Sequence, residues 1–549
     1  MPVIKIRTER LMGLTGLAPG ELRDLLFRLK CESEEVEPGI LEVEVNPDRP
    51  DMLIGEGIAR ALNGLSGKET GYTGYPVYDT GITVKVGPTG SRKYIAVGVV
   101  ENVNVDEDYL EELIQFQEKL HVTFGRRRRK AAIGFHDLSK IPCRSLEYRY
   151  MDPRTVNFKP LHSDREMNAG EVLRETEQGR NYGSINLEGN MHPFLLACGE
   201  VIAMPPVINS DLTRVEPGTR SLLVDVTGPD KTTVLELLDI IVANLAERKN
   251  ARIGRVKIEA PDGTVETPFL KENRMDLTPE YTNRVLGVNI PPGEQAFLLE
   301  RMRYKAAYDG GIVRTVIPPY RVDIISQIDL VEDIAIAYGY DSIPRRTGWP
   351  TMRGRLSPIT LFSRIVREIL VGAGYTEVMQ LVLTGPSAIR DYWSRDELVE
   401  IGNPVMLEYS ILRPSLIPGL LQVAKSNISA SKPVKAFEIG PVVKRKAGSI
   451  EEKTSLGLLY MDDEASYEQL QAVVYKLLRI IGMEPSVRPG SHPLLVEGRT
   501  GVIYSPAGVY LGVIGEVKPQ VLVDYGIDYP VIIGELDLER LMEAAGWNG

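Results

Sequence analysis

Cysteine is scarce in this chain, which has only Cys31, Cys143 and Cys198 in 549 residues. The three are odd in number, far apart, and not in the paired spacing of zinc-binding cysteines. The sequence therefore predicts neither a disulfide framework nor a cysteine-bound metal. Such cysteine usage also favours a reducing, cytoplasmic setting.

Long apolar runs and an excess of positive charge are also missing. No segment reaches the roughly 18 uninterrupted apolar residues of a membrane span, and the first residues, MPVIKIRTERLMGLTG, contain no apolar signal core. The formal net charge is −11, whereas proteins that depend on phosphate contacts usually carry a basic balance. We therefore expect no membrane partner, and any role with nucleic acid requires a local basic patch or a partner chain.

One such patch is GRRRRK, residues 125–130, with five consecutive cations. A solvated turn between strands explains it well, and a phosphate-binding site is the alternative. A glycine loop of the form GxxxxGK[ST], which cradles phosphates, is absent from the sequence. Its absence weakens the hypothesis of a free-standing magnesium phosphotransferase.

The chain is too long for a single hydrophobic core, because domains usually run to roughly 100–200 residues. Breaks in composition occur at residues 71–81, which suit a linker, from residue 259, and at residues 342–358. They predict four domains: 1–80, 81–265, 266–345 and 346–549. Helical and extended patterns alternate throughout, so we expect a multidomain fold of the α/β and α+β classes.

Local patterns predict several elements within these segments. SLLVDVTG, residues 221–228, is typical of a strand that ends at a glycine. Thr233 and Glu236 form a capping box for the helix that follows. In the last segment, Ser357 and Pro358 suit the start of another helix with one apolar face.

The stretch PYRVDIISQIDLVEDIAIAYGYDSIP, residues 319–344, places acids among apolar residues that favour burial, Ile325 and Ile328 among them. Its β-rich start predicts a short strand over 321–324, and its middle predicts a helix capped by Ser326. Helical spacing would bring three of the acids to one face, and the fourth, at the end of the strand, could join them. The four acids are Asp323, Asp329, Glu332 and Asp333.

Three interpretations of this acidic cluster are open. Hard oxygen ligands without histidine or cysteine favour magnesium over zinc. Acids in the first turn of a helix also favour the positive end of its dipole, by roughly 0.3–1 kcal/mol each. Finally, they can pair with Arg321, Arg345 or Arg346. Four like charges repel one another, so we expect a positive group among them, which a metal or a partner's basic side chain would supply.

Further upstream, NPDRPD precedes a helix that is expected to start near Leu53. Asp48, Arg49 and Asp51 are close in this stiff turn. We interpret them as a structural ion-pair knot rather than as catalytic residues.

Five long stretches of the sequence, taken together and in this order, resemble those of a known protein family. They are the acidic segment described above and four others: VNPDRPDMLIGEGIARALNG (45–64), RRKAAIGFHDLSKIP (128–142), GEVIAMPPVINSDLTRV (199–215) and NPVMLEYSILRPSLIPGLL (403–421). Together they resemble the β subunits of phenylalanine–tRNA ligase of the archaeal and eukaryotic type, over nearly the whole chain.

The resemblance implies a division of labour within an α2β2 heterotetramer that acts on tRNA(Phe). The α subunit would carry the ATP-dependent activation site. The β subunit would supply a class II synthetase-like but inactive C-terminal domain, a winged-helix-like module and an editing domain in the middle of the chain. It also implies a magnesium ion, shared with the α subunit, at Asp323, Asp329, Glu332 and Asp333.

The last segment lacks the groups that a class II synthetase core needs. Arg413 resembles the arginine that holds the triphosphate, but VYLGVIGEVKPQVL has Gly512 and Gly515 without a following arginine. Without both cations, the charge that develops on the α-phosphate is not stabilised. We expect this chain to activate no amino acid. The apolar face of the helix after Ser357 would lie either against the α subunit or in its own core.

An editing site is useful because phenylalanine and tyrosine differ by only one hydroxyl group. An apolar pocket rejects the tyrosine hydroxyl only about a hundredfold, so a second site that binds the hydroxyl is useful. The family places it near 81–265, where the candidates are Asn209, Ser210, Asp225 and Thr227, beside a stiff Pro205–Pro206 pair. No nucleophile–histidine pair is evident, so hydrolysis would use a positioned water. The alternative is a scaffold subunit without an active site, with these residues serving turns and strand ends.

Overall fold

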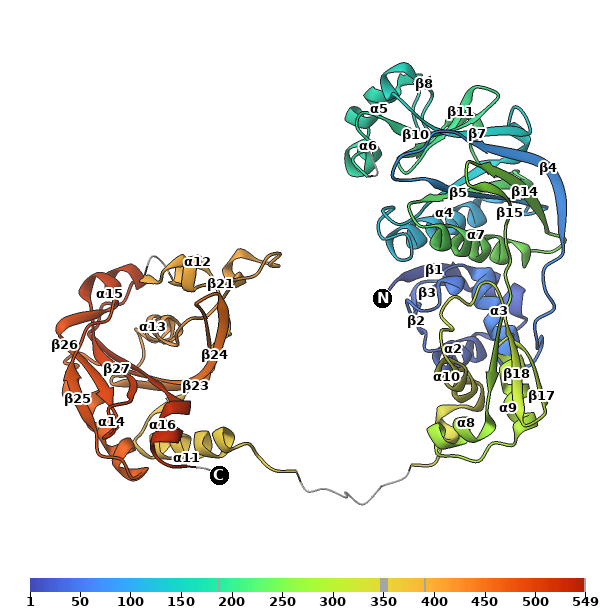
Figure 1. The fold of residues 1–549 in the computed structure, drawn as a ribbon. Helices are drawn as coiled ribbons and strands as arrows, with labels where there is room; N and C mark the ends of the chain where they lie inside the picture. The colour runs from blue at the N-terminus through green and yellow to red at the C-terminus, as the bar shows by residue number, and fades with distance from the viewer. Residues whose placement is uncertain (186–187, 346–353, 390–391, 548–549) are drawn as a thin grey trace. The chain divides into compact units, whose positions relative to one another are not determined.

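The structure is a computed structural model that describes residues 1–185, 188–345, 354–389 and 392–547 (Figure 1). Arg346, one of the predicted partners of the acidic cluster, lies outside these residues. The chain divides into two compact units, Met1–Thr347 and Gly348–Gly549. In the described part of the chain, no helix is long and apolar enough to cross a membrane.

The first unit begins with a three-stranded antiparallel sheet and three helices. The sheet order is β1-β3-β2. The expected helix near Leu53 is present as α3, and its apolar residues pack against those of α1 and α2. The elements are β1 (Val3–Arg7), α1 (Thr8–Thr15), α2 (Pro19–Arg28), β2 (Glu32–Glu37), β3 (Ile40–Glu44) and α3 (Gly55–Ser66).

The ion-pair knot before α3 is confirmed in part. Arg49 binds Asp51 through two hydrogen bonds of 2.8 and 2.9 Å. Asp51 also accepts one from Arg60 at 3.2 Å. Asp48 lies outside this knot and pairs with Lys30 at 3.6 Å.

A ten-stranded sheet then dominates residues 77–267, where Figure 1 shows α4 and α7 together on one side of it. Its main path runs β12-β11-β10-β7-β4-β14-β5-β13-β6, and β15 pairs with β14. The strands are β4 (Val77–Val86), β5 (Tyr94–Glu101), β6 (Ala132–Asp137), β7 (Ser145–Met151), β10 (His192–Ala197), β11 (Glu200–Met204), β12 (Ile208–Asn209), β13 (Ser221–Gly228), β14 (Arg252–Ala260) and β15 (Gly263–Thr267). The pair β8 (Asn157–Phe158) and β9 (Met167–Asn168) and the helices α4 (Glu107–Val122), α5 (Ala169–Glu175), α6 (Glu177–Tyr182) and α7 (Lys231–Ala246) complete the region.

Strand β13 confirms the predicted alternation. Leu222, Val224 and Val226 belong to the apolar cluster that includes α7. Leu223 belongs to a second cluster that includes residues of β7 and β10. Asp225 and Thr227 share the side of Leu223, because side chains alternate along a strand.

Two local predictions in this region are wrong. The predicted linker at 71–81 ends early, because β4 already begins at Val77. The capping box of Thr233 and Glu236 is also absent: α7 begins at Lys231, and Asp230 accepts a hydrogen bond from the Thr233 N–H at 2.8 Å. An aspartate is as good an N-cap as a threonine, so the pattern alone left the position uncertain by one turn.

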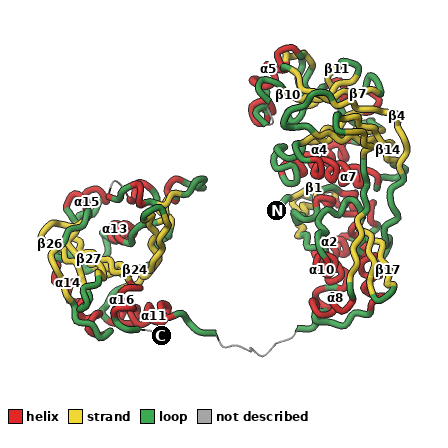
Figure 2. Tube along the Cα trace, viewed as in Figure 1, coloured by secondary structure: helices red, strands yellow, loops and turns green. Residues whose placement is uncertain are grey.

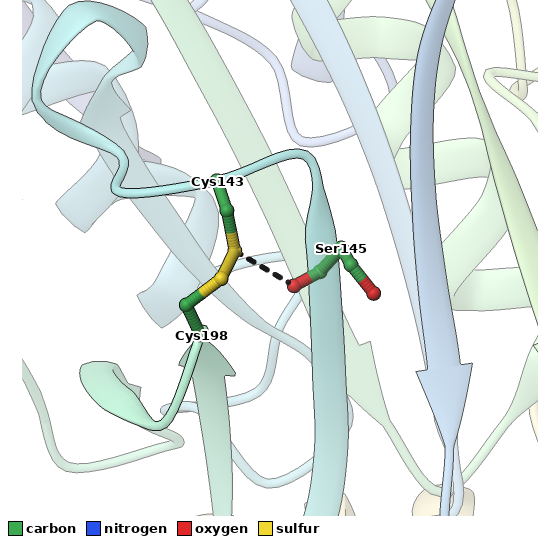
Figure 3. The surroundings of a disulfide bond; sticks show 3 residues. All are labelled: Cys143, Ser145 and Cys198. Atoms are coloured by element: carbon green, nitrogen blue, oxygen red, sulfur yellow. Dashed lines mark hydrogen bonds between the residues drawn. A yellow bond between two sulfur atoms is a disulfide. The ribbon is translucent and has the colours of Figure 1, made fainter.

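The prediction of no disulfide is wrong as well, since Cys143 and Cys198 are bonded across 55 residues of sequence (Figure 3). Antiparallel pairing explains the contact. The register Leu146↔Ala197 places the residue after β10 next to the segment before β7. Figure 3 also shows Ser145, whose backbone oxygen lies 3.2 Å from the Cys143 sulfur. Cysteine usage therefore gives no argument for a reducing compartment.

The third part of this unit is a three-stranded antiparallel sheet, β16-β18-β17, with three helices. It contains β16 (Asn273–Leu277), α8 (Pro279–Leu286), α9 (Pro292–Arg301), β17 (Lys305–Asp309), β18 (Ile312–Ile317) and α10 (Gln327–Tyr338). The predicted box of Ser326 and Asp329 caps α10. The predicted strand at 321–324 is wrong, because β18 ends before Pro318 and a turn follows, with the Arg321 N–H donating to the Pro318 carbonyl.

The second unit is built on a seven-stranded sheet, β19-β23-β24-β28-β27-β26-β25, with a small sheet, β20-β22-β21, beside it (Figure 2). The strands are β19 (Thr376–Glu377), β20 (Leu383–Thr384), β21 (Val399–Glu400), β22 (Ile411–Leu412), β23 (Val434–Lys446), β24 (Ser449–Met461), β25 (Ser486–Pro489), β26 (Leu495–Tyr504), β27 (Tyr510–Val517) and β28 (Val531–Asp537). The helices are α11 (Pro358–Gly372), α12 (Pro386–Ile389), α13 (Ile417–Ser426), α14 (Tyr467–Ile480), α15 (Pro519–Tyr525) and α16 (Leu538–Ala544).

The helix predicted after Ser357 is present as α11, and Ser357 caps it. Phe362, Val366 and Leu370 are each at most 1% exposed and belong to the core cluster that includes α14 and α16. Of the two interpretations of its apolar face, the structure supports the unit's own core over an interface.

Candidate functional site

A cavity of about 490 Å³ opens beside β6. Its walls come from α4, from the segment around α6 and from residues 205–215, so three sequence regions meet there. The volume lies within the roughly 300–1,000 Å³ of typical ligand sites. Pro205 and Pro206 line it, next to the predicted candidates Asn209, Ser210 and Asp225.

Two buried polar side chains at the floor of the cavity, Asp225 and Thr213, are linked behind it by a third, His136. Asp225 on β13 lies opposite Gly134 on β6, and its Oδ1 is 2.8 Å from His136 Nε2. His136 Nδ1 is 2.7 Å from the hydroxyl of Thr213. All three side chains are at most 2% exposed. Gly134 is required there, because a Cβ at this position would overlap the Asp225 carboxylate.

Asn209 and Ser210 lie at the edge strand β12 and directly after it. The Asn209 amide donates to the Phe135 carbonyl at 3.3 Å, which ties this segment to β6. Ser210 accepts a hydrogen bond from the Leu212 N–H at 3.3 Å and its hydroxyl donates to the Lys159 carbonyl. Asn209 is half-buried and Ser210 is buried, so the amide is the more accessible of the two to a bound molecule.

Thr227 does not join the other three candidates in the cavity. It is fully buried, and its hydroxyl accepts a hydrogen bond from Arg92 Nε at 3.0 Å. Arg92 also donates to the Thr227 and Arg128 carbonyls, and burial lowers its pKa to about 10. Thr227 therefore helps to hold a buried arginine behind the floor.

The basic turn at 125–130 lies at the rim of this cavity. Arg128 lines the cavity and donates to the Pro206 and Val207 carbonyls, each at 3.1 Å. It also donates to Glu118 at 2.7 Å. Burial opposes ionisation of Glu118, but hydrogen bonds and charges from His121 and Arg128 lower its pKa to about 2. The turn is thus fixed to the cavity wall by an ion pair.

The other arginines of the turn face solvent. Arg126, Arg127 and Arg129 are exposed, and Arg126 to Arg128 all have a left-handed backbone, with φ of 48°, 54° and 63°. Non-glycine residues rarely adopt this conformation, so three in succession form an unusual turn. Within the described residues, no acidic side chain forms an ion pair with the three exposed arginines. The result is a concentration of free positive charge beside the cavity.

Three of the four acids around α10 pair with basic side chains of this chain. Arg321, whose side chain is 2% exposed, donates to Asp323 at 2.9 and 2.7 Å and to Asp333 at 2.7 Å. Asp333 also accepts a hydrogen bond from the Tyr304 hydroxyl. Glu332 is exposed and binds Lys30 at 2.8 Å. Positive charge in the cluster is therefore supplied by two basic side chains, Arg321 and Lys30.

Asp329 has a different role, since it accepts the N–H groups of Ile325 and Ser326 at 2.8 and 2.7 Å as part of the helix cap. Across the described residues, no three histidine, cysteine, aspartate or glutamate side chains are grouped so that they could hold a metal ion. The four carboxylates do not fit a magnesium site within this chain. Ile325 and Ile328, expected to be buried, are 85% and 43% exposed.

Arg413, the residue that resembles a synthetase arginine, is buried. Its guanidinium binds Glu438 at 2.5 Å and the Pro441 carbonyl at 2.9 Å. A methyl group at Gly440 would overlap this guanidinium. Arg413 is therefore fixed inside the fold.

Residue patterns missed Thr213, His136 and Arg92. The run GFHDL places Gly134 and His136 two apart on β6, which is the spacing of residues on one face of a strand. This spacing, together with Asp225 on a second predicted strand, was the sequence signal that could have indicated a contact between His136 and Asp225. Only the strand pairing of β6 with β13 shows that the histidine reaches the aspartate.

Comparisons with known proteins point in one direction. The phenylalanyl tRNA synthetase beta chain CLM domain model matches residues 343–538, and the tRNA synthetase B5 domain model matches residues 275–340. The phenylalanine–tRNA ligase beta subunit of Aeropyrum pernix is 51% identical over 98% of this chain and 99% of its own length. That of Metallosphaera sedula is 40% identical over 98% and 99%. The crystal structure of an N-terminal fragment of the phenylalanyl-tRNA synthetase beta-subunit from Pyrococcus horikoshii is 35% identical, with a TM-score of 0.59, and covers 62% of this chain and 100% of the fragment.

Proposed function

The chain belongs to the family of phenylalanine–tRNA ligase β subunits, and from this premise we propose that it hydrolyses tyrosine-charged tRNA(Phe) in the cavity beside β6. In this reaction a water oxygen bonds to the ester carbonyl carbon, and the bond from that carbon to the ribose oxygen breaks. One proton of the water ends on the ribose hydroxyl. The products are free tyrosine and uncharged tRNA.

The observation that carries the proposal is the convergence of Asn209, Ser210 and Asp225 on one cavity. The cavity combines apolar walls, including Ile133 and Val207, with polar side chains that include Asn209 and Asp225. A tyrosine side chain needs such a site, because its ring favours apolar surface and its hydroxyl favours a polar partner. Phenylalanine would leave that partner unpaired, which gives the discrimination.

The basic turn supports a nucleic-acid substrate. The chain has a net charge of −11, so attraction of RNA must come from local charge. Arg126, Arg127 and Arg129 supply it at the rim of the same cavity, with Arg128 fixing the turn in place. We infer that they bind phosphates near the charged end of tRNA.

The second unit supports an accessory role in aminoacylation. Arg413 is committed to Glu438, so it is not available to hold a triphosphate. We propose that ATP-dependent activation occurs on an α subunit within an α2β2 heterotetramer in the cytoplasm. Large apolar side chains on this unit fit a docking surface for it, because such exposure is costly in a free protein. They are Met379 (91% exposed), Leu381 (65%), Val405 (101%) and Leu407 (73%).

The exposed Ile325 and Ile328 suit a further contact with the α subunit. A magnesium ion shared with that subunit stays a prediction, because on this chain Arg321 and Lys30 already pair with three of the four carboxylates. We therefore propose no magnesium-dependent step here.

The test is mischarging by the αβ complex in the presence of ATP, tRNA(Phe) and excess tyrosine. We expect tyrosyl-tRNA to accumulate with Asn209→Ala and with Asp225→Asn, but not with the unaltered complex. Asp262→Asn, an exposed change in the turn after β14, is the matched control and should behave as the unaltered complex. Equal accumulation in all four would instead support a scaffold subunit without its own active site.

A further inference from the structure

Thr213, His136 and Asp225 form a buried hydrogen-bonded chain, and His136 was not among the predicted site residues. We propose that His136 is a positioning residue of the hydrolytic site, which fixes the Asp225 carboxylate and the Thr213 hydroxyl at the cavity floor without touching the substrate. This inference rests on the proposed function and adds a residue to its site.

The hydrogen-bond roles follow from the groups involved. A carboxylate only accepts, so His136 Nε2 must carry a proton and donate it to Asp225 Oδ1 over 2.8 Å. In the neutral ring, Nδ1 is then an acceptor, and the Thr213 hydroxyl donates to it over 2.7 Å. The ring therefore has one partner on each nitrogen, and its orientation is fixed from both sides.

Each member of this chain comes from a different element. His136 is on β6, Asp225 is on β13, and Thr213 ends the short helical turn that follows β12. The histidine thus joins the sheet to the segment that carries Asn209 and Ser210. Of the three, Thr213 and Asp225 line the cavity, so the histidine connects two cavity groups from behind.

The arrangement leaves one carboxylate oxygen for the reaction. His136 holds Oδ1 of Asp225, and among the residues that the structure describes no hydrogen bond reaches Oδ2. Oδ2 is thus the oxygen that can accept a proton from a water in the cavity. A carboxylate held on one side keeps this oxygen in one direction, and displacement by about 1 Å can cost roughly a hundredfold in rate.

A purely structural role would satisfy the same buried polar groups, and kinetics separates the two. The experiment measures kcat and KM for hydrolysis of tyrosyl-tRNA(Phe) by the αβ complex, with phenylalanylation of tRNA as the measure of folded enzyme. For His136→Leu, we expect kcat to fall by about a hundredfold with KM within twofold. For Thr213→Val, which removes only a hydroxyl, we expect a fall of about tenfold. Thr213→Ser, which restores the hydroxyl, should recover most of that loss.

The outcomes are distinct. If the unaltered complex does not hydrolyse tyrosyl-tRNA, the proposed function is wrong and this inference is overturned with it. If it does, and the variants retain its kcat per folded enzyme, only the inference is overturned. If His136→Leu does not fold, Thr213→Val decides: a lowered kcat that Thr213→Ser recovers supports the inference, and an unchanged kcat overturns it.

Discussion

Arg321 is the internal counter-ion of the acidic cluster, and replacing it with methionine should destabilise the first unit strongly. Its guanidinium is 2% exposed and is shared by two carboxylates, with Asp323 at 2.7 Å and Asp333 at 2.7 Å. Methionine replaces the apolar stem of the side chain but lacks the guanidinium, so it leaves both charges without their partner. Breaking a buried ion pair in this way costs about 3–5 kcal/mol.

The assay is calorimetric unfolding of the full chain, in which the first unit should melt earlier by several degrees. Adding Asp323→Asn and Asp333→Asn to Arg321→Met should recover much of the loss, because the unpaired charges are then gone. A cost of less than about 1 kcal/mol for Arg321→Met alone, the usual value of an exposed pair, would contradict this role of Arg321. Excess magnesium that stabilises the unaltered chain as much as the arginine is expected to would contradict it as well.

Three further predictions concern other parts of the first unit. Burial would raise the pKa of Asp51, but Arg49 and Arg60 lower it to about 2. The ionised carboxylate therefore stabilises the fold fully above about pH 4, and this stabilisation is lost as the pH falls toward 2. In Asp51→Asn, the free energy of unfolding should fall by about 2 kcal/mol less over this pH range than in the unaltered protein. Replacing both Cys143 and Cys198 with serine should lower the free energy of unfolding by about 2–4 kcal/mol. Free thiols at both positions in mass spectrometry of the unaltered protein would contradict this prediction. Arg126→Ala with Arg127→Ala should raise KM for charged tRNA and reduce its salt dependence while kcat stays constant; an unchanged KM would remove RNA binding from this turn.

Local sequence patterns predicted elements where the deciding interactions are local. The caps at Ser326 and Ser357 are set by side chains within three residues, and both helices begin as expected. The alternation of β13 is likewise visible in eight consecutive residues. The Thr233 box failed because Asp230, one turn earlier, is an equally suitable cap.

Interactions between distant residues could not be read from the sequence in the same way. Cys143 meets Cys198 only because β7 pairs with β10. Arg321 was one of three possible partners for the acids, and only the fold decides among them. His136 reaches Asp225 because β6 is the edge strand next to β13. The resemblance to a family pointed to residues 81–265 as the region of the candidate site. The positions of its side chains relative to one another depend on the pairing of β6 with β13.

We propose that the cavity beside β6 distinguishes tyrosine from phenylalanine on tRNA. The most direct measurement is the rate at which the αβ complex deacylates purified tyrosyl-tRNA(Phe) and phenylalanyl-tRNA(Phe) under identical conditions. A site that binds the hydroxyl predicts at least about a hundredfold preference for the tyrosyl ester, and Asp225→Asn, which removes the carboxylate that accepts a proton from water, should abolish hydrolysis of that ester. Equal rates for the two esters, or unchanged hydrolysis of the tyrosyl ester by Asp225→Asn, would contradict this function of the cavity.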